Sequence, residues 1–176
     1  TGDFTMEMYN ADGSRGAMCG NGIRCVGKYV YDRRLTRKTC LTIDTDAGPR
    51  GLELAVRGGK VEQVTVDMGQ AVLYPEIELE AMGERYTVHQ VGVGNPHAVL
   101  FCPDPEGIRL EELGPVLECH PDLRERSNVE FVSCQGGHDL HVRVWERGSG
   151  ITLACGTGAC ACFAAARRAG LCGDRV

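Results

Sequence analysis

The sequence predicts an α+β protein made of two similar halves, residues 1–72 and 73–176, each with mostly antiparallel strands and one main helix. Three observations lead to this prediction. Many short runs have alternating apolar residues, which is typical of half-buried strands. Two longer runs are apolar and helix-like. Each of these two runs begins with a Cys-Gly-x-Gly turn, "CGNG" at residues 19–22 and "CGTG" at residues 155–158.

The first half opens with "DFTMEMYN" (residues 3–10), an alternating run that predicts a strand, and "ADGS" (11–14), which predicts a turn. "GNGIRCVGKYVYD" (20–32) predicts a helix, because its apolar residues recur every three or four positions. Further alternating runs predict strands over residues 40–46, 51–57 and 60–69. "RGG" between the last two indicates a hairpin.

The second half starts with a stretch of looser texture, residues 70–84, where we place the boundary between the halves. "RLEELGPVLECH" (109–120) predicts a short helix that Gly114-Pro115 interrupts. "GTGACACFAAARRAG" (156–170) is rich in Ala and ends at a glycine, so it predicts a helix with a glycine stop. Alternating or apolar runs predict strands over residues 85–95, 97–102, 128–134 and 139–146.

Composition excludes some classes of protein. The formal net charge is −5, and "RRLTRK" (33–38) is the one basic cluster, so we expect a solvated loop there and no nucleic-acid partner. No run reaches the roughly 18–20 apolar residues of a membrane helix, so no membrane association is expected. The chain starts at Thr1 without an initiator Met, and a targeting segment ahead of it cannot be judged.

The ten cysteines show no Cys-x-x-Cys pair, which argues against a zinc site. We therefore expect no metal and a reducing, cytoplasmic location. Outside the two glycine turns, the expected role of a cysteine is a small buried hydrophobe. This applies to Cys25, Cys40, Cys102, Cys119, Cys134, Cys160, Cys162 and Cys172.

The two cysteine turns belong to a longer repeat with an offset of 136 positions. At this offset Cys19 aligns with Cys155, Gly22 with Gly158, and Asn10 with Glu146. Both copies then run strand, glycine-rich turn, Cys-Gly-x-Gly, helix. Such an ordered match indicates two copies of one fold unit. We expect the copies to pack face to face with a cleft between them.

A cysteine at a helix start lies near the positive end of the helix dipole, which lowers the thiol pKa and favours the thiolate. The backbone N–H groups of Gly20, Asn21, Gly156 and Thr157 could bind a carboxylate. Two thiols on opposite sides of a cleft suit stereoinversion, in which one removes a proton from carbon and the other delivers one to the opposite face. The alternative for each turn is a purely structural role, as a tight strand-to-helix connection with a buried thiol.

Pyridoxal phosphate is the alternative source of such chemistry, and it needs a Schiff-base lysine. The three lysines lie in a predicted helix (Lys28), a basic loop (Lys38) and a hairpin (Lys60). None has a convincing setting, so we expect no cofactor.

The sequence resembles diaminopimelate epimerase, a cofactor-independent amino-acid epimerase, in the motifs "YNADGS", "MCGNGIRC", "GNPHAV", "SNVEF" and "ERGSGITLACGTGACA". The resemblance implies two pseudo-symmetric halves, each a sheet wrapped around a central helix. It implies interconversion of LL- and meso-2,6-diaminopimelate in lysine and peptidoglycan precursor biosynthesis, and a possible homodimer. Proline and hydroxyproline racemases are the alternative family, but their first turn typically carries His where this chain has Asn21.

The resemblance assigns roles residue by residue. Cys19 and Cys155 match the catalytic cysteines, and His97 and Glu146 match residues that assist them. The residues matching those that bind the reacting carboxylate in the family are Gly20, Asn21, Gly156 and Thr157. The residues matching the rest of the substrate site are Asn10, Asn95, Asn128, Glu146 and Arg147.

Ordinary structural roles remain open for these residues. Asn10 and Asn95 could cap turns, and Asn128 could be a loop residue. Glu146 and Arg147 could form a surface ion pair, and His97 could be an ordinary strand histidine. Two other classes of function also remain: a redox switch formed by Cys19 and Cys155, and a binding protein without catalysis.

Family members extend further at both ends. The missing strands would leave exposed sheet edges and apolar helix faces, so we expect these 176 residues alone to be marginally stable or prone to aggregation, and weakly active or inactive.

Overall fold

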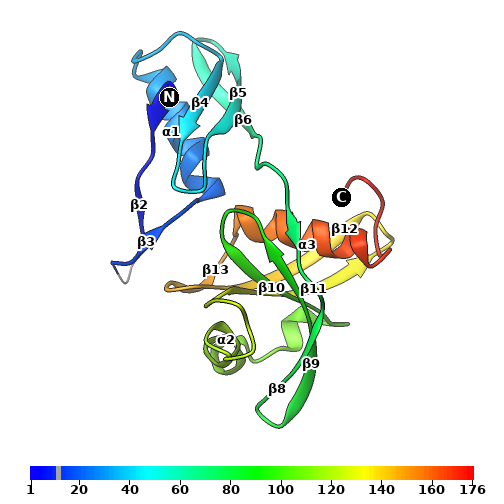
Figure 1. Cartoon of the computed structure of the whole chain (residues 1–176). Helices are drawn as coiled ribbons and strands as arrows, with labels where there is room; N and C mark the ends of the chain where they lie inside the picture. The colour runs from blue at the N-terminus through cyan, green and yellow to red at the C-terminus, as the bar shows by residue number, and fades with distance from the viewer. Residues whose placement is uncertain (11–12) are drawn as a thin grey trace. The chain divides into compact units, whose positions relative to one another are not determined.

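The computed structural model describes residues 1–10 and 13–176, and the chain forms two compact units, Thr1–Gly69 and Gln70–Val176 (Figure 1). The predicted turn "ADGS" falls partly on residues 11–12, which lie outside the described residues. The second unit begins a few residues before the predicted boundary at residue 72, because strand β7 (Val72–Leu73) pairs with β9 of that unit.

The first unit contains a four-stranded sheet in the order β1–β4–β5–β6. β1 (Phe4–Thr5) pairs parallel with β4 (Cys40–Asp44), and the other neighbours are antiparallel. The remaining strands of the sheet are β5 (Arg50–Arg57) and β6 (Lys60–Val66). The expected strand over residues 3–10 is divided, since β2 (Met8–Tyr9) leaves this sheet to pair with β3 (Arg15–Gly16).

Helix α1 (Gly20–Asp32) packs against β5 and β6, as its apolar spacing predicted. Its buried side chains, Ile23 and Val30, join Leu41, Ile43 and Leu52 of the sheet in one core. Gly27 makes the close approach possible, because a Cβ there would lie 2.7 Å from Leu52 Cδ2. The predicted β5–β6 hairpin is confirmed, and its two turn glycines have φ of +58° and +75°, a conformation that glycine adopts without strain.

The second unit contains a larger sheet in the order β13–β12–β11–β10–β9–β7, with β8 on β9. β10 and β11 are parallel, and the other neighbours are antiparallel. The bounds are β8 (Ile77–Ala81), β9 (Glu84–Gly92), β10 (Pro96–Phe101), β11 (Asn128–Gln135), β12 (Asp139–Glu146) and β13 (Gly150–Thr152). Residues 70–84, expected to be looser, therefore include β7 and β8.

Two helices cover opposite faces of this sheet (Figure 1). A 3-10 turn (Pro105–Gly107) and α2 (Leu110–Glu118) connect β10 to β11, and α2 buries Leu110, Leu113 and Leu117 against one face. α3 (Gly156–Arg168) packs on the other face, against β9 to β12. Each unit thus has one helix that follows a cysteine turn and packs on a mostly antiparallel sheet, as predicted.

Helix α2 continues through Gly114-Pro115, so the expected interruption is wrong. Pro115 removes one hydrogen bond of the helix, but burial of three leucines on the same helix outweighs that loss. Gly114 lets the helix approach Trp145, because a Cβ would lie 2.6 Å from Trp145 Cδ2.

All ten cysteines are free thiols, but the expectation that most are buried is only partly correct. Cys162 is buried on α3, whereas Cys25, Cys40 and Cys119 are exposed. Cys25 lies on the outer face of α1, Cys40 points to the solvent side of its alternating strand, and Cys119 follows the last turn of α2. Burial of a cysteine here depends on which face it occupies.

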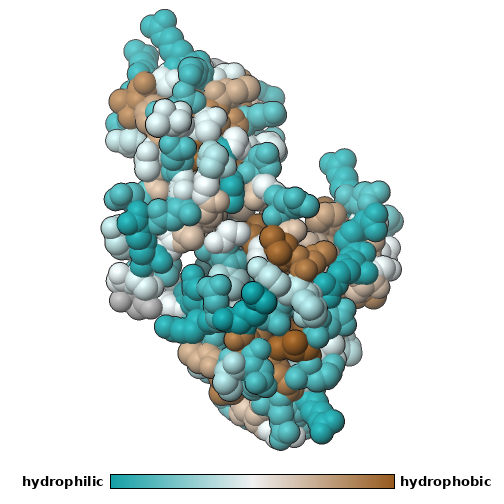
Figure 2. All heavy atoms as spheres, in the orientation of Figure 1, coloured by the Kyte–Doolittle hydropathy of each residue, from teal (hydrophilic) through white to brown (hydrophobic). Residues whose placement is uncertain are grey.

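Hydrophilic side chains cover much of the visible face, interrupted by smaller apolar patches (Figure 2). In the described part of the chain, no helix is long and apolar enough to cross a membrane.

Candidate functional site

Cys19 is the N-cap of α1, where the helix was predicted to start. Its backbone is extended, with φ −133° and ψ 110°, and its Sγ accepts a hydrogen bond of 3.2 Å from the Gly22 N–H. Cys19 therefore does what a serine or aspartate does at other helix starts. The glycine keeps this contact open, since a Cβ on Gly22 would lie 3.3 Å from the sulfur. The neighbouring Asn21 accepts a hydrogen bond from Arg24 through its side-chain oxygen.

Cys155 repeats this arrangement at the start of α3. Its φ of −117° and ψ of 114° are close to those of Cys19, and its Sγ accepts the Gly158 N–H at 3.4 Å. The Thr157 hydroxyl also lies 3.4 Å from the sulfur. The alignment of the two turns at an offset of 136 positions therefore corresponds to the same local geometry at both helix starts.

Burial raises the pKa of the Cys155 thiol to about 12. Burial makes the largest contribution to this net shift; the carboxyl groups of Glu130 and Glu146 also raise the pKa, and hydrogen bonds with Thr157 and the Gly158 N–H lower it. The expectation that the helix start lowers the thiol pKa is wrong for Cys155. Desolvation of a thiolate outweighs the roughly half charge at a helix N-terminus.

His97 lies at the start of β10, with its side chain fully buried. Its Nδ1 is 2.7 Å from Oε1 of Glu130, whose side chain is also fully buried. In the parallel pairing of β10 with β11, His97 lies opposite Asn128. Glu130 is two residues further along β11 on the same face, so its side chain can reach His97. His97 is therefore part of a buried hydrogen-bonded pair at the start of a strand.

Asn128 connects two segments of the candidate site. Its amide Nδ2 donates to the Pro96 carbonyl at 3.1 Å, and its Oδ1 accepts the Arg147 N–H at 2.9 Å. Asn128 is a buried strand residue, so the loop alternative is wrong. It ties the start of β10 to the turn that carries Arg147.

Glu146 ends β12 and Arg147 follows it, and their side chains have different partners. The Glu146 carboxylate accepts a hydrogen bond from the Thr152 hydroxyl, and the Arg147 guanidinium donates to the Arg126 carbonyl at 3.1 Å. The glycine-rich turn between β12 and β13 places Glu146 opposite Gly150. These contacts differ from the surface ion pair that was the alternative.

Asn10 and Asn95 both lie in turns. The Asn10 side chain donates to the Ser14 hydroxyl at 3.0 Å, and its carbonyl accepts the Gly13 N–H at 3.0 Å, as in a turn cap. The Asn95 carbonyl accepts the Val93 N–H at 3.0 Å between β9 and β10. Turn formation is thus one role of each, and it is compatible with a second role in binding.

The structure divides the expected residues between the two units. The first unit holds Asn10, Cys19, Gly20 and Asn21. The second unit brings together Asn95, His97, Asn128, Glu146, Arg147, Cys155, Gly156 and Thr157 around the ends of β10, β11 and β12 and the start of α3. A pocket of about 380 Å³ beside Cys155 is lined by apolar residues of β12, by Leu153 and by Glu130.

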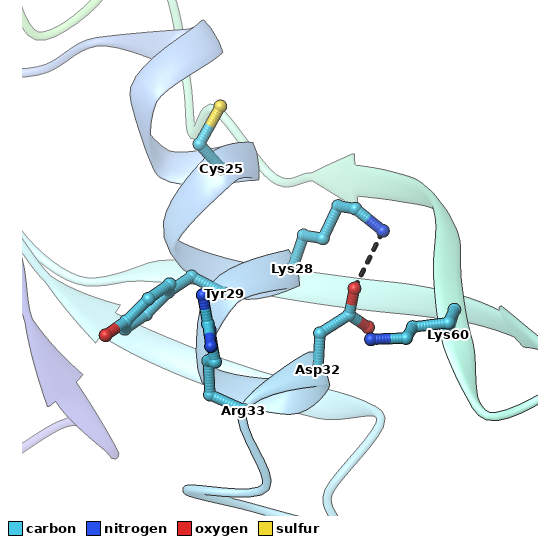
Figure 3. A pocket seen from close by; sticks show the side chains of 6 residues that line it. All are labelled: Cys25, Lys28, Tyr29, Asp32, Arg33 and Lys60. Atoms are coloured by element: carbon cyan, nitrogen blue, oxygen red, sulfur yellow. Dashed lines mark hydrogen bonds and ion pairs between the residues drawn. The ribbon is translucent and has the colours of Figure 1, made fainter.

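Another pocket, of about 510 Å³, lies in the first unit on the outer face of α1 (Figure 3). Lys28 and Asp32, one turn apart on α1, form an ion pair at 2.9 Å beside it, and Lys28 also donates to the Val61 carbonyl. None of its lining residues belongs to the expected site. The pair instead links α1 to β6, because Asp32 accepts the Val61 N–H at 2.9 Å.

Two carboxylates of the second unit were not found from the sequence. Glu118 ends α2 and accepts hydrogen bonds from Arg126, from Trp145 Nε1 at 2.7 Å and from the Gly148 N–H at 3.3 Å. It therefore supports the turn that carries Glu146 and Arg147. Glu130 is the second one, and a signal for it exists: it is the one acidic residue in an otherwise apolar and polar-uncharged strand, "NVEFVSC".

The fold is similar to that of two solved structures. A hydroxyproline epimerase from Agrobacterium vitis matches 96% of this chain and 57% of its own, with a TM-score of 0.74 and 18% identity. A probable proline racemase from Agrobacterium radiobacter K84 matches with a TM-score of 0.77 and 16% identity, over 96% of this chain and 57% of its own. At these identities the likeness concerns the fold, and it agrees with the predicted fold class.

Sequence comparison identifies the family. The family model for diaminopimelate epimerase matches residues 1–74 and 89–176. The diaminopimelate epimerase of Bacteroides thetaiotaomicron is 51% identical over 175 residues, which is 98% of this chain and 64% of that protein. That of Leptospira biflexa is 47% identical over 176 residues, 92% of this chain and 63% of that protein. The chain belongs to the diaminopimelate epimerase family and spans less than two thirds of the length of these relatives.

Proposed function

We propose that the protein interconverts LL- and meso-2,6-diaminopimelate without a cofactor, in lysine and peptidoglycan precursor biosynthesis. One observation carries the proposal: Cys19 and Cys155 cap two equivalent helices with the same backbone geometry and the same Sγ contact to a glycine N–H. A single capped thiol is an ordinary structural feature, whereas two matched ones provide an acid and a base of the same kind.

The proposed reaction is an inversion at one α-carbon of the substrate. One cysteine, as thiolate, takes the α-proton, and the electron pair of the broken C–H bond moves toward the carboxylate. The other cysteine, as thiol, gives its proton to the opposite face of the same carbon. The protons balance, since one thiol gains what the other loses. The reverse reaction exchanges the two roles.

Stabilisation of the negative charge is assigned to the helix starts. The N–H groups at Gly20, Asn21, Gly156 and Thr157 belong to the first turns of α1 and α3, and N–H groups of a first turn point out of the start of the helix. Donors of this kind stabilise a carboxylate that takes up charge in the transition state. His97 and Glu146 are assigned to assist the thiols.

The distal end of the substrate is assigned to polar groups around the β12–β13 turn. Arg147 matches a carboxylate in charge and shape, and Asn10, Asn95 and Asn128 suit a zwitterion because an amide both donates and accepts. Asn128 and Arg147 are already linked by a hydrogen bond of 2.9 Å, which holds the turn in place. A substrate with two charged ends fits this set better than proline does.

Chemistry without pyridoxal phosphate agrees with the surroundings of two lysines. The Lys28 ammonium is paired with Asp32, and Lys38 with Asp3. Ten free cysteines suit the reducing cytoplasm, where we place the enzyme. We further propose that the intact enzyme is a homodimer.

The test follows proton exchange at the α-carbon. The intact protein is incubated with LL-diaminopimelate in D₂O, and formation of the meso isomer and deuterium uptake are measured. Cys19→Ala and Cys155→Ala should each abolish inversion. Cys25→Ala and Cys160→Ala, which alter the same two helices, are the matched controls and should remain active.

Each alternative predicts a distinct result. A binding protein would bind diaminopimelate without exchange of the α-proton. A redox switch whose thiols take no part in proton transfer would epimerise equally well when oxidised and when reduced. A racemase of another substrate would label proline or hydroxyproline and leave diaminopimelate unlabelled. Any of these results would refute the proposal.

A further inference from the structure

Glu130 is a fully buried carboxylate of the second unit, in a part of the sheet that also buries His97. It lies in the middle of the sheet on β11, between β10 and β12, and its exposed fraction is 0%. A buried carboxylate costs several kcal/mol unless it is paired. Glu130 lies on the face that α3 covers, so the groups that pair with its carboxylate must lie there.

The first contact of Glu130 is with His97. Oε1 of the carboxylate lies 2.7 Å from Nδ1 of the imidazole, and neither side chain is exposed. When Glu130 is ionised, its carboxylate only accepts a hydrogen bond, and Nδ1 of His97 carries the proton. In the neutral imidazole, Nε2 is then the acceptor. Among the described residues, this buried Nε2 has no hydrogen-bond partner.

The second contact of Glu130 is with the start of α3. A Cβ on Gly158 would lie 2.7 Å from Oε1 of Glu130 and 3.3 Å from Sγ of Cys155. The carboxylate oxygen and the sulfur therefore lie within about 6 Å of each other, a range in which a negative charge disfavours a neighbouring thiolate. Glycine at position 158 is what allows the carboxylate this close to the helix.

The titratable groups around Glu130 come from each element packed against it. They are His97 on β10, His141 on β12, which lines the same pocket, and Cys155 and Cys162, at the start of α3 and within it. The charge of Glu146, at the end of β12, acts on Cys155. Burial and the charge of Glu130 both raise the pKa of Cys155, in agreement with the distances. Glu130 is thus the group that touches both His97 and the start of α3.

We propose that Glu130 is a positioning residue of the epimerase reaction, which holds His97 with Nε2 as its acceptor nitrogen and keeps Cys155 in the protonated form until the thiol gives its proton to carbon. The inference rests on the proposed function. Glu130 exchanges no proton with the substrate. When Cys155 is the acid, its S–H bond breaks as the new C–H bond forms, and the other cysteine takes the proton of the C–H bond that breaks. The charge of Glu130 then favours return of a proton to the Cys155 thiolate.

Two substitutions separate charge from hydrogen bonding. Glu130→Gln keeps an acceptor for the His97 N–H but removes the charge, whereas Glu130→Leu removes both. Glu130→Asp retains the charge and serves as the conservative variant. Glu80→Gln, an exposed glutamate of β8 in the same unit, is the matched control for loss of one negative charge.

The pH profile of kcat/KM in the intact protein is the first readout. In Glu130→Gln we expect the alkaline limb to move about one unit toward lower pH, because the Cys155 thiol then ionises more readily. We expect Glu130→Leu to lose at least tenfold in kcat with little change in KM, and Glu130→Asp to recover part of that loss. A wild-type pH profile in Glu130→Gln would overturn the inference.

The ¹⁵N NMR spectrum of His97 is the second readout, and it does not depend on activity. We expect the Nδ1–H tautomer in the wild type and in Glu130→Gln, and its loss in Glu130→Leu. The Nε2–H tautomer in the wild type would overturn the inference. A wild-type protein without diaminopimelate epimerisation would refute the proposed function instead, and the NMR result would still decide the His97–Glu130 contact.

Discussion

The carboxylate of Glu118 offers a quantitative test of how the β12–β13 turn is held. Glu118→Ala removes the acceptor of three hydrogen bonds, from Arg126, Trp145 and Gly148. Arg126 is half exposed, so its ion pair contributes about 0–1 kcal/mol. The Trp145 and Gly148 donors are partly buried, and each one left without an acceptor costs about 1–3 kcal/mol. We expect a loss of about 2–7 kcal/mol in the free energy of unfolding.

Urea unfolding of the intact protein, followed by Trp145 fluorescence, measures this loss, since Trp145 is the one tryptophan of this chain. Glu118→Gln keeps one carbonyl oxygen, and we expect it to lose about 1–2 kcal/mol. Glu111→Ala, an exposed glutamate on the same helix, is the matched control and should change stability by less than about 0.5 kcal/mol.

The same variant tests the link between this turn and the site. Because the turn carries Glu146 and Arg147, we expect Glu118→Ala to raise the KM for diaminopimelate more than it lowers kcat. If Glu118→Ala and Glu111→Ala were equally stable, the three hydrogen bonds would contribute nothing net. The assignment of Glu118 as the support of the turn would then be refuted.

Three further predictions concern the two units separately. Gly27→Ala should destabilise the first unit by about 1–3 kcal/mol, because the added methyl group would lie 2.7 Å from Leu52 Cδ2; thermal unfolding measures this, and an unchanged midpoint would contradict the packing. Asn128→Ala should raise KM several-fold by freeing the Arg147 N–H at the turn, as steady-state kinetics would show; an unchanged KM would separate Asn128 from substrate binding. The pKa of Cys155 is raised by burial to about 12, above its ordinary value of 9.0, so between these values the unfolded chain has lost a proton that the folded chain keeps. The free energy of unfolding is therefore unaffected by Cys155 ionisation below pH 9 and falls by about 1.4 kcal/mol per pH unit above it. Urea unfolding at pH 8 and pH 10 should show this steeper loss in the wild type relative to Cys155→Ala. Equal losses in the two proteins would refute the raised pKa.

Much of the local structure follows from the sequence alone. Apolar spacing predicts α1, Ala content and a glycine stop predict α3, and the Cys-Gly-x-Gly turns place the helix starts at Cys19 and Cys155. The glycines of "RGG" predict the β5–β6 hairpin. These features depend on residues a few positions apart, whose backbone preferences act before any distant segment is in contact.

Other features could not be predicted because they depend on segments far apart in the chain. Glu130 meets His97 only because β10 and β11 pair in parallel, and Glu118 meets Trp145 only because α2 packs against β12. The high pKa of Cys155 has the same origin. The helix start acts on the thiol locally, but burial by the sheet and two distant carboxylates reverse its effect. The sequence by itself determined where the thiols and helices stand, and the tertiary structure decided which charges surround them, since desolvation and pairing exist only once the sheet and helices have come together.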